Sequence, residues 1–124
     1  MTVVYLWFNA ALYFAFGVLC TLKVDKASTA QGFLSLDSNG RCEYLAVYGG
    51  MEIGFAAFYA ICALKPEYRS AGVLFSLCLY AGIVAWRLSA LMTLSNLSTT
   101  TKSIAGLEVA LLIGSVLLFF KVLE

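Results

Sequence analysis

Four long apolar stretches constrain this chain more than any other feature. They cover residues 3–22, 43–64, 70–91 and 104–123, and each has about the 20 residues that a helix needs to cross a hydrocarbon core about 30 Å thick. Backbone polar groups find no water in that core, so segments of this length must be helical. The chain has 124 residues, 62% of them hydrophobic and 12% charged, which leaves little room for a soluble domain. We therefore predict an all-α fold, a single integral membrane four-helix bundle over residues 1–124.

Residues 23–42 form the one long polar segment between the predicted spans, and we expect them to lie on the membrane surface. Asp25 is placed to cap a short helix over residues 26–33, because its carboxylate can accept the free amide protons of a first turn. The Ser-Asn-Gly sequence at residues 38–40 predicts a turn. This segment would cover whatever opens on its side of the membrane, which we name side B. The opposite surface, where the first span begins, is side A.

Composition excludes several kinds of site. The chain has no histidine, which removes the commonest general base and the usual zinc and haem ligand. Its four cysteines form no Cys-x-x-Cys pair, so a thiol-redox enzyme is disfavoured. Cys20 and Cys42 flank the polar segment and would pair only if it faces an oxidising compartment. The net charge is +1 and there is no basic run, so we expect no nucleic acid, and we predict no cofactor and no metal.

Three charged residues interrupt the predicted spans. Counted at 1.5 Å per residue from side B, Glu52 lies about 13 Å deep, Arg87 about 6 Å and Glu108 about 6 to 8 Å. Because all three lie in the half of the membrane nearest side B, we expect them to form one cluster in the bundle interior. Arg87 would hold one or both carboxylates through its planar guanidinium. Ionisable residues inside a membrane are expensive and often functional.

The charge balance of this cluster predicts its chemistry. Two carboxylates and one guanidinium leave one negative charge in excess, which a shared proton, a bound cation or a ligand donor would compensate. The candidate catalytic residues are therefore Glu52, Glu108 and Arg87, with one glutamate as general acid or base and Arg87 stabilising developing negative charge. The alternative is a structural cluster that fixes how the helices pack.

Polar and aromatic side chains share the helix faces with these charges. In the first span Tyr5, Asn9, Tyr13 and Phe16 follow one helical face. Tyr5 is expected at the membrane interface, whereas Asn9 needs a hydrogen-bond partner in mid-span. Aromatic side chains around a few polar groups are typical of a small-molecule site, although they more often only pack. The predicted ligand-binding residues are Asn9, Tyr13, Glu43, Tyr48, Tyr59 and Tyr80.

The opposite face of the second span carries small residues. Ala46, Gly50 and Gly54 recur every four residues, a pattern that lets another helix approach closely. Glu52 is two residues from either glycine, about 200° around the helix, and so points away from this seam. If the protein forms a homo-oligomer, the seam of Ala46, Gly50 and Gly54 is the predicted interface.

One set of motifs runs through all four predicted spans. It consists of Phe16-Gly17, Gly40-Arg41-x-Glu43, Tyr48-Gly49-Gly50-x-Glu52-x-Gly54, Arg87 and Glu108. This set resembles the pattern of a bacterial family of small four-helix membrane proteins of unknown function, loosely similar to the DoxX-like proteins, over nearly the whole chain. The resemblance implies a compact multi-pass bundle in the bacterial inner (plasma) membrane with both termini cytoplasmic. It implies no agreed activity, although some more distant four-helix membrane proteins bind sterols or other apolar molecules and isomerise them with acidic residues.

Three functions remain open at this stage. The first, which we favour, is a pocket for a lipid or other apolar small molecule with the acidic and basic residues as its polar floor, with or without acid/base chemistry. The second is an oligomeric transporter or channel coupled to a proton or cation. The third is an accessory subunit that stabilises a larger membrane complex. The sequence does not decide whether the protein is an enzyme.

Overall fold

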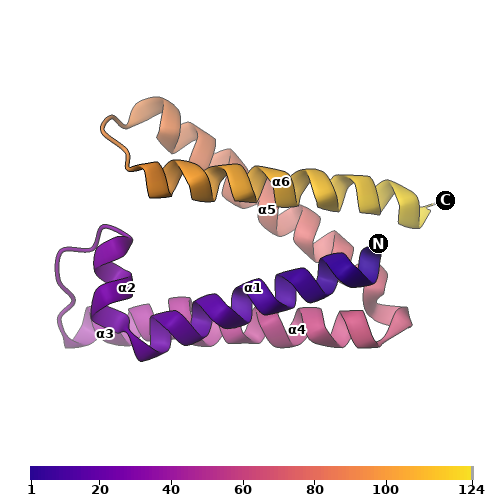
Figure 1. The fold of residues 1–124 in the computed structure, drawn as a ribbon, viewed down its shortest axis with the longest axis horizontal. Helices are drawn as coiled ribbons and strands as arrows, with labels where there is room; N and C mark the ends of the chain where they lie inside the picture. Colours follow the sequence, from indigo (N-terminus) through magenta and orange to yellow (C-terminus); the bar gives the residue numbers. More distant parts are fainter. Residues whose placement is uncertain (124) are drawn as a thin grey trace.

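The computed structural model describes residues 1–123, which are all-α and contain no strand (Figure 1). In chain order the elements are α1 (Thr2–Leu22), α2 (Val24–Ala30), α3 (Ser38–Tyr44), the π-helix η1 (Leu45–Met51), α4 (Glu52–Leu64), the 3-10 turn η2 (Pro66–Tyr68), α5 (Arg69–Thr93) and α6 (Thr99–Leu123). Helices α3, η1 and α4 follow one another without a break and form one long helical run.

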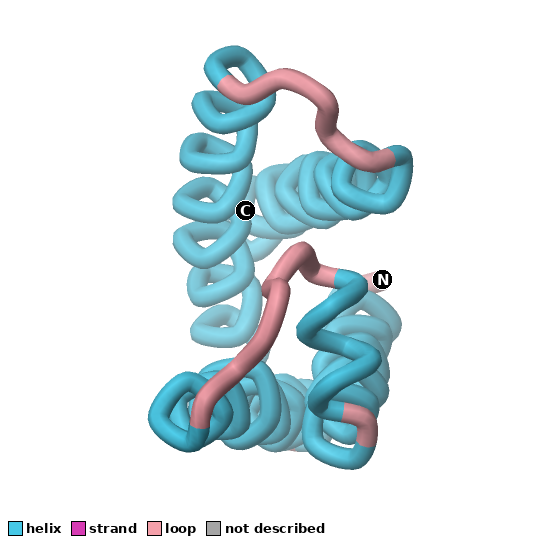
Figure 2. The backbone as a smooth tube through the Cα atoms, turned by 90° about the vertical axis from the view of Figure 1, so that its left-hand side faces the viewer, coloured by secondary structure: helices cyan, strands magenta, loops and turns pink. Residues whose placement is uncertain are grey.

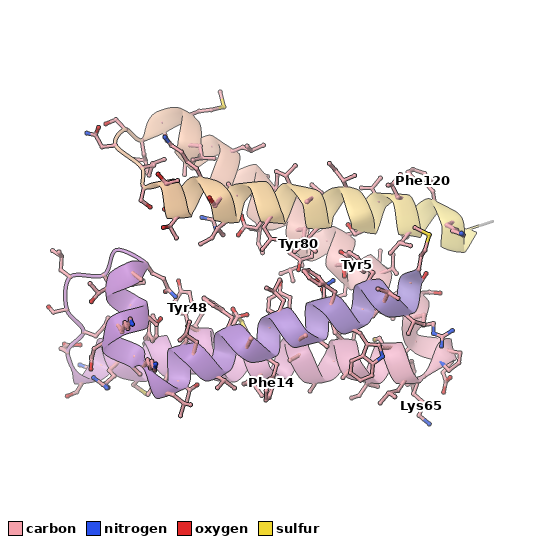
Figure 3. All side chains as sticks on the ribbon, in the orientation of Figure 1. Tyr5, Phe14, Tyr48, Lys65, Tyr80 and Phe120 are labelled. Atoms are coloured by element: carbon pink, nitrogen blue, oxygen red, sulfur yellow. The ribbon has the colours of Figure 1, made fainter. Side chains whose placement is uncertain are left out.

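Within the described residues 1–123, four helical stretches are long and apolar enough to cross a membrane: Thr2–Leu22, Ser38–Leu64, Pro66–Thr93 and Thr99–Lys121. The predicted all-α fold with four spans is thus confirmed, and the chain is a small multi-span membrane protein. Large apolar side chains on its outer surface agree with this. Phe14 and Phe120 are exposed and point away from the bundle (Figure 3), as side chains that face lipid should.

The helices are arranged as two antiparallel pairs. Helix α1 packs along η1 and α4, and α5 packs along α6. The two pairs meet at side A, where both chain ends lie, and separate towards side B, where α2 and the α5–α6 loop lie (Figures 1 and 2). Helix α5 crosses obliquely, from the level of α4 at side A to the level of α6 at side B. The bundle is therefore closed at one membrane surface and spread at the other.

Glycines set the close approach of α1 to the second helical run. A Cβ atom on Gly17 would lie 3.1 Å from the carbonyl oxygen of Gly49, and one on Gly49 would lie 2.6 Å from Thr21 Oγ1. The two backbones are therefore nearly in contact, which any larger side chain would prevent. Both glycines belong to the motifs singled out in the sequence.

The predicted small-residue seam does not take part in the contact between α1 and the second helical run. Ala46, Gly50 and Gly54 are all exposed, and a Cβ atom on Gly54 would meet nothing within 4 Å. The expectation that this seam packs against another helix is thus not met inside the chain. The face of the run that carries Glu52 and Tyr59 packs instead, since both side chains are buried.

A buried hydrogen-bond network joins the two helix pairs. The Tyr80 hydroxyl donates to Asn9 Oδ1, and Asn9 Nδ2 donates to the carbonyl oxygen of Tyr5 at 2.8 Å. The Tyr5 hydroxyl donates to the carbonyl oxygen of Leu111 on α6 at 2.9 Å. Tyr5 and Tyr80 lie between α1 and the α5/α6 pair (Figure 3). Tyr5 thus joins α1 to α6, and its position at the membrane interface stays a prediction.

Helices α4 and α5 approach each other at a further glycine. A Cβ atom on Gly72 would lie 2.8 Å from Leu6 Cδ2 and 2.9 Å from Cys62 Cβ. One turn along α5, Ser76 Oγ lies 2.9 Å from the Tyr59 hydroxyl. Together with the network around Asn9, these contacts fix how the two pairs meet.

The polar segment between the first two spans departs from prediction at its start. Helix α2 begins at Val24, not at residue 26, and Asp25 lies inside its first turn without capping it. The Asp25 carboxylate instead accepts a hydrogen bond from Arg41 Nη1 at 2.8 Å. Both side chains are well exposed, so this ion pair contributes little to stability.

The predicted turn at residues 38–40 is wrong, because these residues form the first turn of α3. Asp37 caps that helix, and its Oδ1 accepts a hydrogen bond from the Gly40 amide at 2.7 Å. An aspartate just before a helix favours this geometry over a turn. The second helical run therefore begins at Ser38, well before the predicted residue 43.

Candidate functional site

Glu52 is the first residue of α4 and directly follows η1. Its side chain is buried, with 8% of the residue exposed, and its Oε2 has no hydrogen-bond partner among the described residues. Placing a carboxylate at mid-membrane costs about 3 kcal/mol on insertion scales. π-helical turns are rare and occur frequently at functional sites. A carboxylate in this position therefore requires a proton, a cation or a donor from a bound molecule.

Aromatic rings line the same interface between α1 and α4. Tyr13 stacks on Tyr59 with ring centroids 5.7 Å apart. Phe55 and Tyr13 form a T-shaped pair with ring centroids 5.5 Å apart. The Cβ atom of Glu52 would lie 3.1 Å from a Cβ on Gly17. Glu52 thus faces α1, in surroundings that are apolar and aromatic.

Arg87 and Glu108 form a bidentate ion pair on the other pair of helices. Arg87 Nη2 donates to Glu108 Oε1 at 2.7 Å, and Arg87 Nε donates to Glu108 Oε2. The side chains are 32% and 12% exposed. Because both carboxylate oxygens are satisfied, this pair neutralises itself and joins α5 to α6.

The predicted cluster of three charges therefore divides in two. Arg87 holds Glu108 alone, and the excess negative charge belongs to Glu52. Glu52 lies 14 residues from Ser38, about 21 Å along the second run, whereas Arg87 is only about 9 Å from the end of α5. The second run carries Glu52, whereas α5 and α6 carry the ion pair, and these two helix pairs separate towards side B (Figure 1).

The predicted ligand-binding residues form three pairs, and the first two pairs adjoin each other through Tyr80 and Tyr13. Asn9 and Tyr80 are bonded to each other in the network that joins the helix pairs. Tyr13 and Tyr59 stack close to the α1–α4 interface that also buries Glu52. Glu43 and Tyr48 lie before Glu52, near the start of the second run at side B. Only the second group shares an interface with Glu52.

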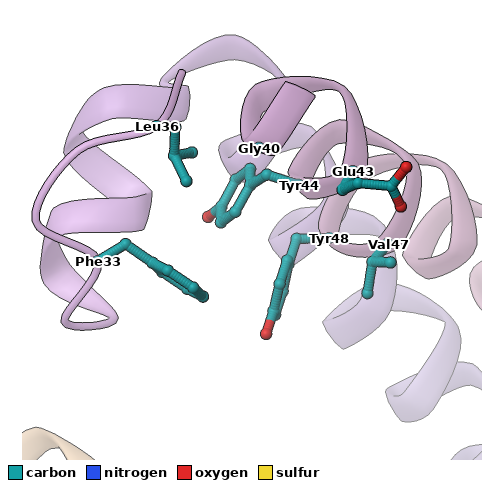
Figure 4. Close-up of a pocket in the computed structure, with 7 residues that line it drawn as sticks. All are labelled: Phe33, Leu36, Gly40, Glu43, Tyr44, Val47 and Tyr48. Atoms are coloured by element: carbon teal, nitrogen blue, oxygen red, sulfur yellow. The ribbon is translucent and has the colours of Figure 1, made fainter. Parts of the chain in front are cut away.

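Glu43 and Tyr48 line a pocket of about 370 Å³ beneath the polar segment (Figure 4). Its other lining residues are Phe33, Leu36, Gly40, Tyr44 and Val47. Tyr44 stacks on Tyr48 with centroids 4.8 Å apart, and Phe33 meets both rings edge-on. Glu43 is exposed and directs its carboxylate away from the three rings. The pocket is thus mainly aromatic packing.

Tyr44 and Phe33 were not among the predicted site residues. Tyr44 is four residues before Tyr48, and this helical spacing was a signal in the sequence. Phe33 lies in the loop after α2, where the sequence offers no periodicity to place it. The Tyr44 hydroxyl donates to Cys20 Sγ at 3.4 Å, and Cys20 and Cys42 are both free thiols in the structure.

Comparison with protein-family models, with curated proteins and with solved structures finds no match for this chain. The resemblance to DoxX-like proteins thus rests on the motif residues alone and assigns no family.

Proposed function

We propose that this protein binds a lipid or another apolar small molecule inside the membrane, with Glu52 as the polar group that recognises it. The observation that supports the proposal is the buried Glu52 carboxylate oxygen, which has no partner within residues 1–123 and lies directly after a π-helix. A ligand that carries a hydroxyl, amine or ammonium group would supply the missing donor. Tyr13 and Phe55, which are both partly exposed, would offer apolar contact, the usual composition of a small-molecule site.

The pocket beneath the polar segment, which Tyr44 and Tyr48 line on the run that leads to Glu52, supports entry from side B or from the bilayer beside it. The Arg87–Glu108 pair would then have a structural role on the α5/α6 side and would not bind the ligand. Its two side chains already satisfy each other's hydrogen bonds. Any acid/base chemistry on the ligand would belong to Glu52, whose carboxylate is not held by a cation. We place the protein in the bacterial inner membrane with both termini cytoplasmic, so that side B faces outward.

Native mass spectrometry of protein extracted gently with its lipids tests this proposal. We expect a specific molecule to co-purify with the wild type. The amount bound to the Glu52→Gln variant should be at least tenfold lower. Glu67→Gln is the matched control, because Glu67 is exposed in the turn between α4 and α5. Retention of the same molecule by Glu52→Gln would contradict the proposal.

A second candidate is an oligomeric transporter for a proton or cation, with Glu52 as the carrier. The exposed seam of Ala46, Gly50 and Gly54 favours it, because an unused small-residue face permits a second copy to approach closely. The same spectra separate the two candidates. A monomer with a bound molecule supports the binding protein, whereas an empty oligomer supports transport.

A further inference from the structure

A second cavity, far from Glu52, lies between the start of α1 and the end of α6 at side A. Its volume is about 620 Å³, within the range of about 300 to 1,000 Å³ typical of ligand sites. One face of each helix lines it, with Val4, Tyr5 and Phe8 on α1 and Gly114, Leu117 and Lys121 on α6. It is a groove on the lipid-facing surface rather than an enclosed chamber, since Val4 and Leu117 are 72% and 66% exposed.

The floor of this groove is apolar because of one glycine and one satisfied tyrosine. A Cβ atom on Gly114 would lie 3.1 Å from Tyr5 Cε2, so the missing side chain leaves the tyrosine ring as the floor. The Tyr5 hydroxyl already donates to the carbonyl oxygen of Leu111. The groove therefore presents hydrocarbon along its length.

A positively charged side chain lies at the side A end of the groove. Lys121 lies in the last turn of α6, at the side A surface, and is the charged side chain among the described lining residues. Lys65, Glu67 and Arg69, at the other turn on side A, add a net charge of +1 to the same surface. An apolar groove with a lysine at the membrane surface is complementary to an amphiphile with an anionic headgroup.

We propose that this groove binds an anionic phospholipid, with an acyl chain between α1 and α6 and its phosphate at Lys121. The lipid is favoured over a free anion because Lys121 is the charged side chain of the described lining and the other side chains are apolar, apart from the hydroxyl of Tyr5, which is already bonded. The bound chain would cover the α1–α6 contact that closes the bundle at side A. This site is independent of the ligand proposed at Glu52.

Titration of delipidated protein with phosphatidylglycerol and phosphatidylcholine of identical chains, followed by native mass spectrometry, tests the site. We expect one phosphatidylglycerol to bind about fivefold more tightly than phosphatidylcholine, the preference that one lysine near an anionic headgroup provides. Lys121→Gln should remove that preference. Val4 is exposed, so the larger side chain of Val4→Trp can occupy the groove without touching the core. This variant should bind both lipids at least fivefold more weakly.

Two controls make the result specific. Lys102→Gln changes an exposed lysine at the other membrane surface and should leave binding unchanged, as should Glu52→Gln. Equal binding of the two lipids by the wild type would overturn the proposal. So would unchanged phosphatidylglycerol binding in both groove variants, or displacement of the lipid by soluble glycerol phosphate alone.

Discussion

At the scale of single residues, Gly17 and Glu52 lie where α1 and the second helical run approach most closely. Gly17 contacts the backbone of the second helical run, and Glu52 follows on the same face of that run. The sequence predicted both as motif residues and predicted the burial of Glu52. It did not predict that Arg87 would leave Glu52 unpaired, because pairing depends on how the helix pairs diverge and not on depth along each helix.

Substituting Gly17 tests the close approach. Gly17→Ala places a Cβ atom 3.1 Å from the Gly49 carbonyl oxygen and 3.0 Å from Ile53 Cδ1, and should destabilise the fold by about 1 to 3 kcal/mol, the usual cost of overpacking. Gly54→Ala is the matched control. It meets no atom within 4 Å and should be neutral or slightly stabilising, since alanine favours helix. Equilibrium unfolding in mixed detergent micelles measures both, and equal stability of the two variants would be evidence against a tight Gly17–Gly49 contact.

At the scale of elements, the four long helices were predictable because about 20 consecutive apolar residues permit little else in a membrane. The polar segment was not, because Asp25 and Asp37 are both good helix caps by residue type. Only Asp37 acts as one, since Asp25 is drawn to Arg41 across the segment. The π-helix was also unpredictable, because no apolar periodicity distinguishes seven π-helical residues from an ordinary helix turn.

The contact between the helix pairs gives an element-scale prediction. Tyr80→Phe removes the hydroxyl that donates to the buried Asn9 side chain and should cost about 1 kcal/mol, a typical value for a hydrogen bond between membrane helices. Tyr68→Phe, at an exposed tyrosine beside α5, should change stability by less than about 0.5 kcal/mol. Unfolding in the same micelles compares the two variants. If Tyr80→Phe is as stable as Tyr68→Phe, this hydrogen-bond network does not stabilise the contact between the helix pairs.

At the scale of the whole molecule, two helix pairs meet at side A and spread at side B, and the charges divide between them. One pair carries a satisfied arginine–glutamate ion pair, and the other carries a buried glutamate for which the described part of the chain provides no partner. Sequence alone could count one excess negative charge in the membrane. Three-dimensional structure was needed to place it on Glu52, and the proposed binding function follows from that placement.

The most direct test of this account is the reaction of the membrane-embedded protein with an apolar carbodiimide, followed by peptide mass spectrometry to locate the modified carboxyl groups. Such a reagent partitions into the bilayer and adds to a carboxyl group that no cation holds. We expect modification at Glu52 and at least tenfold less at Glu108, which Arg87 occupies on both oxygens. Modification of Glu108 in preference to Glu52 would contradict the claim that Glu52 is the unpaired acid of the membrane interior.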